Sequence, residues 1–342
     1  MNERDLYFDN LKFWLILLVV VGHFMEPFYG ESPLGTLYPW IYSFHMPLFV
    51  FVAGYFSKSI TYPKYYVQLV SNLALPYLIF ETLYTWFDFY TQGLEKLHFT
   101  YFYPYWILWF LFSMLLWKML LPYLLVLKAP LWIALWSSVL LGYALDVDYY
   151  ASVSRTLYFL PFFLLGVYFK REWLLPLKKP RVRLVSLLIL LSGAVLLHTL
   201  SPVLEPAWFY GAMNYAQFGL DTWYAGAFRL LTYTFTLLMG AAFLSWVPQQ
   251  RHWYTDRGMN TMYVFLLHGF VVKSLLYFGV LQEIGSVAGG ILPILLGVLV
   301  TVLLSSRVVK ASMSWLVEPN VSFLFKPRVT RRSREVRRKE EF

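Results

Sequence analysis

Long apolar stretches recur along the whole chain, and this repetition constrains the fold more than any other feature. They fall at residues 11–28, 37–57, 65–88, 102–121, 130–145, 155–170, 184–200, 226–247, 259–281 and 289–306. A helix of about 20 apolar residues crosses a hydrocarbon layer about 30 Å thick. With 59% hydrophobic and only 14% charged residues, the sequence predicts an all-α polytopic integral membrane bundle of about ten transmembrane helices. A water-soluble domain is excluded.

The charges between these stretches predict an orientation. Alternate connections hold most of the basic residues, whereas the other set holds mainly acids. The basic set comprises Lys58, Lys64, Lys118, Lys128, Lys170, Arg171, Lys178, Lys179, Arg181, Arg183, Arg251, Arg257, Arg307 and Lys310. Because Lys and Arg are retained on the cytoplasmic side, both termini are expected in the cytoplasm, an N-in/C-in topology. The exceptions are Lys96, Arg155, Arg229 and Lys273.

The sequence predicts one domain followed by a charged tail. We expect a ten-span transmembrane domain over residues 1–325, with residues 11–28 as a retained first span, and a basic, disordered cytoplasmic tail over 326–342. The tail has eight Lys/Arg against three Glu, a net charge of +5. It is expected to lie on anionic lipid rather than on nucleic acid, since no nucleic-acid-binding motif accompanies it. The absence of cysteine excludes disulfides and thiolate catalysis.

Aromatic residues make up 21% of the chain, and many lie at the ends of the apolar stretches. The run from Tyr101 to Trp106 is an example. Tyr and Trp concentrate at the two membrane interfaces, where one end of the ring is apolar and the other is wet. We therefore interpret these aromatic residues first of all as interfacial anchors.

Three of the six histidines are predicted at one depth within the membrane, on three different helices. From the helix rise, His23 and His45 lie roughly 18 Å from the cytoplasmic edge and His268 about 14 Å. A single buried histidine is usually a packing residue, but three at one level in lipid favour a functional site. A metal site is the competing hypothesis. No His-x3-His pair or suitably spaced carboxylate supports it, so no metal is expected.

Other charged residues extend this candidate site. Lys12 precedes His23 by 11 residues, which places both on one helix face about 16 Å apart. Glu26, three residues beyond His23, can reach the imidazole and orient it. A snorkelling lysine and an interfacial glutamate are the alternatives.

An outward-facing polar cavity is a second hypothesis. Glu81, Arg155 and Arg229 fall near the predicted outer ends of their helices or within them, and they could line such a cavity. Each could equally be interfacial.

Blocks of residues along the chain resemble the membrane acyltransferase-3 family, and more closely its fucose-4-O-acetylase-like branch. The first runs from Tyr7 through Lys12 to Gly22-His23-Phe24, with Lys where the family more often has Arg. Phe44-His45-Met46-Pro47 through Gly54 is similar to the block of the second span. Later blocks follow in the expected order: Leu75-Pro76-Tyr77, Leu108-Trp109-Phe110-Leu111, Arg155 through Gly166, and Tyr263 through His268.

The resemblance implies an enzyme, an acyl-CoA-dependent O-acyltransferase. It would move an acyl group, usually acetyl, from cytoplasmic acetyl-CoA to a hydroxyl of an extracytoplasmic or lipid-linked glycan, in a bacterial inner membrane. His23 is then the expected general base, and Glu26, His45 and His268 complete the catalytic group. Lys12, Lys58 and Lys64 are candidates for holding the donor's phosphates. Glu81, Trp109 and Arg155 are candidates for binding the acceptor.

Two other functions remain open at this point. A transporter or flippase for a lipid-linked glycan could use intramembrane histidines as a proton relay, although paired broken helices and internal symmetry are missing from the sequence. An intramembrane protease would need a Ser/His or paired-Asp arrangement, which the spans lack. The acceptor, the acyl chain length and the oligomeric state are not predicted.

Overall fold

A computed structural model describes residues 5–29, 35–58, 60, 64–144, 149–200, 204–287 and 290–320, and these residues are helical with no strand among them. The predicted all-α class is therefore confirmed. Residues 326–342 lie outside the described part, so the division into a domain and a tail stays a prediction.

The α-helices run in this order: α1 (Leu6–Met25), α2 (Leu37–Tyr42), α3 (His45–Tyr55), α4 (Lys64–Leu69), α5 (Leu75–Gln92), α6 (Trp109–Leu124), α7 (Pro130–Leu141), α8 (Val153–Tyr168), α9 (Leu174–Leu177), α10 (Pro180–Thr199), α11 (Ala225–Trp246), α12 (Thr261–Tyr277), α13 (Val280–Val287), α14 (Ile291–Leu304) and α15 (Arg307–Val317). Short 3₁₀ helices connect them: η1 (Glu26–Phe28), η3 (Trp106–Leu108), η4 (Tyr150–Ser152), η5 (Arg171–Trp173), η6 (Pro206–Phe209), η7 (Ala216–Phe218) and η8 (Thr255–Met259). A π-helical turn, η2 (Val70–Ala74), joins α4 to α5.

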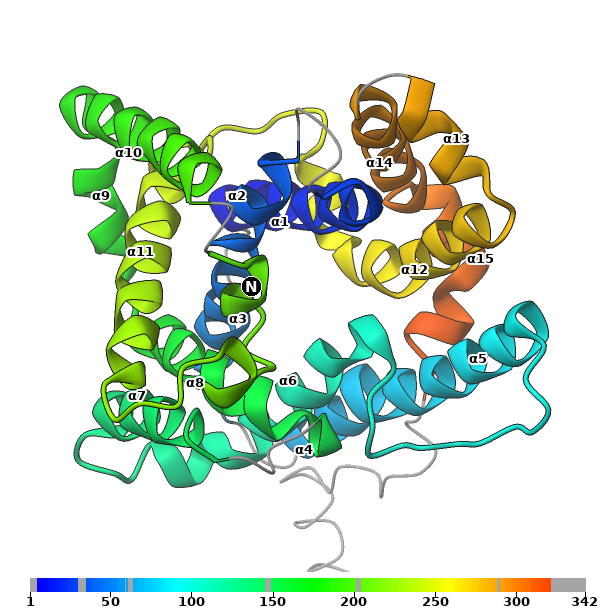
Figure 1. Ribbon diagram of the computed structural model, residues 1–342, viewed down its shortest axis with the longest axis horizontal. Helices are drawn as coiled ribbons and strands as arrows, with labels where there is room; N and C mark the ends of the chain where they lie inside the picture. The colour runs from blue at the N-terminus through cyan, green and yellow to red at the C-terminus, as the bar shows by residue number, and fades with distance from the viewer. Residues whose placement is uncertain are drawn as a thin grey trace, which may run out of the picture.

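Helix α1 lies inside the bundle, between two groups of helices (Figure 1). It packs against α3 on one side and against α12 and α14 on the other. Asp5 caps its start by accepting a hydrogen bond of 3.1 Å from the Tyr7 amide. Most of its residues are buried, as expected for a helix that is apolar all round.

The second apolar stretch is broken, whereas the sequence predicted one span over 37–57. Helix α2 ends at Tyr42 and α3 begins at His45, with Phe44 in a non-helical conformation (φ −142°, ψ −22°) between them. Pro47 has no N–H to bond the carbonyl of Ser43 four residues earlier, so a continuous helix would lose a hydrogen bond there. The break places His45 in the first turn of α3.

Two glycines let α3 and α8 approach closely. A Cβ atom on Gly54 would lie 1.9 Å from the Phe163 carbonyl oxygen, and a Cβ on Gly166 would lie 1.9 Å from the Phe51 carbonyl oxygen. The contact is therefore reciprocal and made by backbone atoms. Small residues are the usual device for close helix packing in membranes, where apolar side chains gain nothing by leaving lipid.

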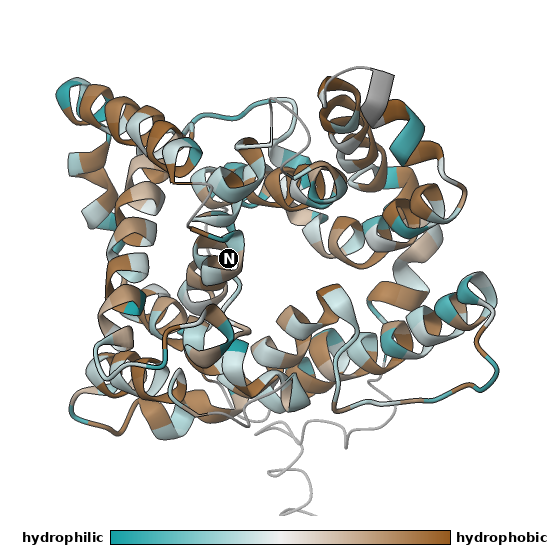
Figure 2. Ribbon diagram, in the orientation of Figure 1, coloured by the Kyte–Doolittle hydropathy of each residue, from teal (hydrophilic) through white to brown (hydrophobic). Residues whose placement is uncertain are grey.

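Five helical segments among the described residues are long and apolar enough to cross a membrane: Leu6–Phe28, Trp106–Leu124, Tyr150–Tyr168, Pro180–Thr199 and Ala225–Trp246. The bent pair α14 and α15 makes a sixth if it counts as one span. Apolar residues cover both central and outer helices (Figure 2), and only 17% of the α10 span is buried. These exposed apolar faces support a membrane protein. The count of ten spans and the orientation stay predictions.

Substituting either glycine of the α3–α8 contact is expected to destabilise the protein. Gly54→Ala and Gly166→Ala each force a methyl group into a backbone carbonyl, and overpacking of this kind typically costs about 1–3 kcal/mol. Thermal unfolding of the protein in detergent measures the effect. The matched control is Gly240→Ala in α11, where the nearest atom is a flexible Leu48 methyl at 3.3 Å. Equal unfolding temperatures for all three variants would contradict the close contact.

Candidate active site

Two of the three predicted membrane histidines lie side by side. The rings of His23 in α1 and His268 in α12 stack with centroids 5.5 Å apart and planes 28° from parallel. His268 is fully buried, and its Nδ1 lies 2.9 Å from the Val264 carbonyl oxygen one turn earlier. Since a carbonyl only accepts, His268 Nδ1 carries the proton and a neutral ring leaves Nε2 with its lone pair. That Nε2 atom is buried without a hydrogen-bond partner among the described residues.

Glu26 completes a carboxylate–imidazole pair with His23. Glu26 Oε2 lies 3.1 Å from His23 Nδ1, and the two side chains are 44% and 14% exposed. The short helix η1 begins at Glu26, directly after α1, so the carboxylate returns to the face that bears His23. A carboxylate that binds Nδ1–H leaves Nε2 of the imidazole as the basic atom.

The ring of Tyr42 lies between His45 and His23. The His45 ring lies 4.8 Å from the Tyr42 ring, and the Tyr42 hydroxyl lies 3.4 Å from His23 Nδ1. His45 is buried, with Nδ1 2.8 Å from the Ile41 carbonyl oxygen. Tyr42 therefore separates His45 from the stacked pair. It also connects them.

Trp106 closes the site from the side of α5 and α6. Its ring meets His23 edge-on at 4.6 Å and lies 6.5 Å from His268. Its backbone φ is +29°, a conformation that side chains other than glycine rarely adopt. Lys273 lies over the Trp106 ring at 5.6 Å.

Of the predicted acceptor-binding residues, Arg155 and Trp109 lie together. The Arg155 guanidinium sits 5.1 Å from the Trp109 ring centre and 5.2 Å from the Tyr149 ring centre. Its Nε atom is buried without a hydrogen-bond partner among the described residues.

Glu81, the third of these residues, does not contact the histidines. It is buried, and its carboxylate accepts a 2.9 Å hydrogen bond from the Tyr105 amide. Glu81, Asp88 and Tyr105 help to line a cavity of about 510 Å³ between α5 and residues 94–105. Glu81 is thus linked to the histidines through Tyr105 and Trp106.

Two of the three predicted donor-binding lysines, Lys12 and Lys58, lie at the N-terminal end of α1. Lys12 forms an ion pair of 2.8 Å with Asp9 and lies over the Phe56 ring at 5.4 Å. Lys58 follows α3, lies over the Tyr55 ring at 4.0 Å and donates to the Phe169 carbonyl oxygen. Partial burial lowers the pKa of the Lys58 ammonium, and Glu172 opposes that change. The side chain of Lys64 lies outside the described residues.

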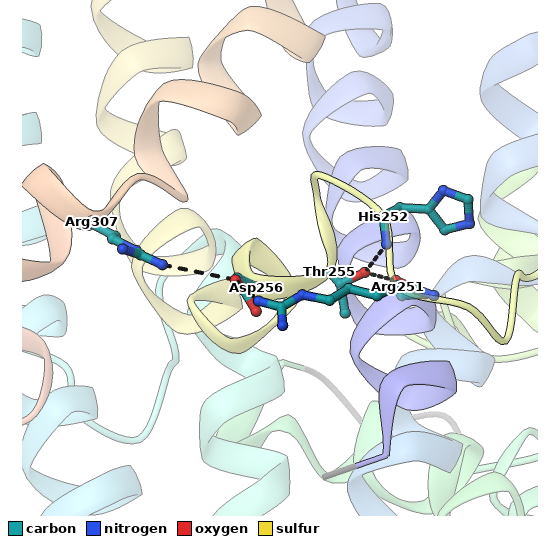
Figure 3. Close-up of polar contacts among 6 residues, drawn as sticks. Arg251, His252, Thr255, Asp256 and Arg307 are labelled. Atoms are coloured by element: carbon teal, nitrogen blue, oxygen red, sulfur yellow. Dashed lines mark hydrogen bonds and ion pairs between the residues drawn. The ribbon is translucent and has the colours of Figure 1, made fainter.

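A polar clamp holds this end of α1 in place. Asn10 is fully buried; its amide nitrogen donates to the carbonyl oxygens of Pro248 (2.9 Å) and Gln250 (2.8 Å). Thr255 donates to Asn10 Oδ1 over 2.6 Å and accepts from the His252 amide over 2.8 Å. Beside this clamp, Asp256 pairs with Arg251 at 2.8 Å and with Arg307 at 3.9 Å (Figure 3). The clamp ties α1 to the loop before α12, which carries His268.

Tyr42, Trp106 and Lys273 lie at the site although they were not predicted as residues of it. Lys273 did give a signal, because it was one of the exceptions to the loop charge pattern. Tyr42 and Trp106 gave none, since an aromatic residue near the end of an apolar stretch usually anchors a helix at the interface. Among the described residues, no group of three His, Asp or Glu side chains could hold a metal ion.

Comparison with known proteins gives a family over most of the chain. The family model described as an acyltransferase domain matches residues 5–307. Nodulation protein NolL from Mesorhizobium japonicum and its counterpart from Sinorhizobium fredii are each 37% identical over 82 residues. That segment is 23% of this chain and spans 22% of the length of either relative. No solved structure matches.

Removing the clamp is expected to lower stability. Asn10→Ala leaves the Pro248 and Gln250 carbonyls and the Thr255 hydroxyl without this partner, and an unsatisfied buried polar group costs about 1–3 kcal/mol. The unfolding temperature in detergent should fall. Ser192→Ala is the control, because Ser192 is exposed and bonds only the carbonyl of Ile189 in its own helix. An Asn10→Ala protein as stable as the control would contradict a structural role for the clamp.

Proposed function

This chain belongs to the acyltransferase-3 family and is a membrane acyltransferase, and from this premise we propose that it is an acyl-CoA-dependent O-acyltransferase. The donor is cytoplasmic acyl-CoA, with acetyl-CoA as the first donor to test. The acceptor is a hydroxyl of an extracytoplasmic or lipid-linked glycan. The enzyme would lie in the inner membrane of a bacterium, with ten spans and both termini in the cytoplasm.

His23 is the general base of the proposed reaction. The contact between Glu26 and His23 Nδ1, at 3.1 Å, is the observation that carries this assignment. It directs Nε2 away from the carboxylate, and it stabilises the imidazolium that forms when the ring takes a proton. A hydroxyl is too weak a nucleophile at neutral pH unless a base removes its proton during attack.

In the proposed reaction His23 carries the proton, and no other group of the protein has to accept it. The acceptor oxygen attacks the thioester carbonyl carbon, a C–O bond forms, and the hydroxyl proton moves to His23 Nε2. The tetrahedral intermediate then collapses, the C–S bond breaks, and the coenzyme A thiolate takes the proton from His23 Nε2. His268 and Tyr42 lie beside His23 and would orient the reactants, and the Tyr42 hydroxyl would be the hydrogen-bond donor to the oxyanion, because neutral His268 and His45 each present a lone pair at Nε2.

The donor would reach His23 along α1 from the end that bears Lys12. Lys12 and His23 are separated by about 16 Å of helix, a distance suited to a long, thin pantetheine arm. Lys12, Lys58 and Lys64 would hold the phosphates of the donor. Lys12 would exchange its ion pair with Asp9 for the phosphate.

Loss of His23 should abolish turnover and spare donor binding. General base catalysis typically contributes about a hundred- to ten-thousand-fold to the rate, and it acts in the transition state. His23→Ala and His23→Asn should therefore lose activity in a thioester-release assay with acetyl-CoA, while calorimetry detects unchanged binding. His252→Ala, at an exposed histidine, is the control. Near-normal turnover by His23→Ala would refute the mechanism.

The sides of substrate entry can be tested in vesicles. In inverted vesicles, acyl-CoA added outside faces the former cytoplasmic surface and should support acylation of glycan trapped inside. The readout is the acyl mass increment on the glycan by mass spectrometry. Transfer only with acyl-CoA on the opposite side would refute the N-in/C-in topology, because the Lys/Arg asymmetry predicts one orientation.

A further inference from the structure

Trp106 occupies a conformation that its own residue type disfavours. Its φ of +29° places it where residues other than glycine are strained, and such residues persist only where their surroundings fix them. The ring nevertheless contacts His23 and lies near His268. Some neighbouring contact must therefore hold the backbone at this point.

Tyr105, the preceding residue, is held by α5 in three ways. Its amide donates to the buried Glu81 carboxylate over 2.9 Å. Its hydroxyl donates to Asp88 over 2.6 Å. Its ring stacks on Tyr84 with centroids 4.9 Å apart and planes 13° from parallel. Tyr105 is thus fixed to α5 at its backbone, at its ring and at its hydroxyl.

Glu81 is the contact that acts on the backbone directly beside Trp106. The Tyr105 N–H belongs to the peptide between Pro104 and Tyr105, one residue before the peptide that joins Tyr105 to Trp106, so the bond to Glu81 anchors the segment that leads into Trp106. Lys273 adds a second restraint, because it lies over both the Tyr105 ring (4.9 Å) and the Trp106 ring (5.6 Å) and pairs with Asp88 at 3.6 Å.

We propose that Glu81 is a positioning residue for the histidine pair: by holding Tyr105 it keeps the strained Trp106 ring against His23 and His268. Glu81 touches neither histidine and acts through Tyr105 and Trp106. The consequence for catalysis rests on the proposed function, in which His23 is the base. The consequence for the exposure of His23 does not rest on it.

Chemical modification tests the exposure of His23 without any need for activity. Diethyl pyrocarbonate adds a carbethoxy group to an accessible imidazole nitrogen, and peptide mass spectrometry follows each histidine separately. Losing the Tyr105 hydrogen bond in Glu81→Ala should free Trp106 and raise the modification rate of His23 about fivefold. His252, exposed at the other end of α1, is the internal reference and should not change.

Matched variants separate positioning from charge and packing. Glu81→Gln keeps an oxygen acceptor for the Tyr105 amide and should react as the wild type does. Glu95→Ala removes a carboxylate from the same cavity wall and should also have no effect. If Glu81→Ala does not fold, Glu81→Asp tests the same contact with a carboxylate one methylene shorter, and it should raise the His23 rate.

A double-mutant cycle tests whether Glu81 acts through Trp106. Trp106→Ala should raise the His23 rate by itself, and Glu81→Ala should add little in that background, because coupled residues are not additive. An unchanged His23 rate in the Glu81 variants would overturn the proposal. Equal rates for the Gln and Ala variants, or additive effects in the cycle, would overturn it as well.

Kinetics then separate this proposal from the proposed function. In acceptor-independent hydrolysis of acetyl-CoA, Glu81→Ala should lower kcat with little change in KM, and Glu81→Gln should restore kcat. If wild-type protein hydrolyses no acetyl-CoA and transfers no acyl group, the proposed function fails. The modification experiment still decides whether Glu81 positions Trp106. A loss of kcat without altered His23 exposure would overturn the positioning role alone.

Discussion

The hydrocarbon layer offers polar groups no hydrogen bonds, and the arrangement of this bundle follows from that constraint. Buried polar side chains meet carbonyl oxygens of neighbouring helices or loops. Arg229 donates to Ser138 and Met213, Tyr233 to Tyr158, and Trp117 to Thr156. These bonds connect α6, α7, α8 and α11 at fixed positions. Such contacts explain why charged and hydroxyl groups can lie deep among apolar helices.

In the described residues of the candidate site, some buried polar atoms lack such hydrogen-bond partners. His268 Nε2, Arg155 Nε and Asp88 Oδ1 are buried without a hydrogen-bond partner among the described residues. Leaving such groups unpaired costs free energy, and a substrate that supplies the missing partners would recover it. The polar groups of the candidate site are thus among those that the bundle itself leaves unsatisfied in the described part of the chain.

The directions in which the histidine side chains point could not be predicted from the sequence. Helix rise put His23, His45 and His268 at a similar level, and the structure stacks two of them. Helix rise could not show that Tyr42 separates His45 from the pair, because the rotation of each helix about its axis depends on packing. Glu81 was recognised as a polar residue at membrane depth. Its partner, however, is the backbone amide of Tyr105, and residue identities do not reveal a backbone bond between distant segments. The break before His45 was missed because the apolar pattern continues across it, although Pro47 marked the place.

The reciprocal contact of Gly54 and Gly166 has a consequence for motion. At these two positions the helices touch through backbone atoms, with a carbonyl oxygen beside each Cβ position. Because no flexible side chain separates them there, α3 and α8 should move as one rigid body. His45 lies in α3 and Arg155 lies in α8. The two residues should therefore keep their mutual position whenever other parts of the bundle move.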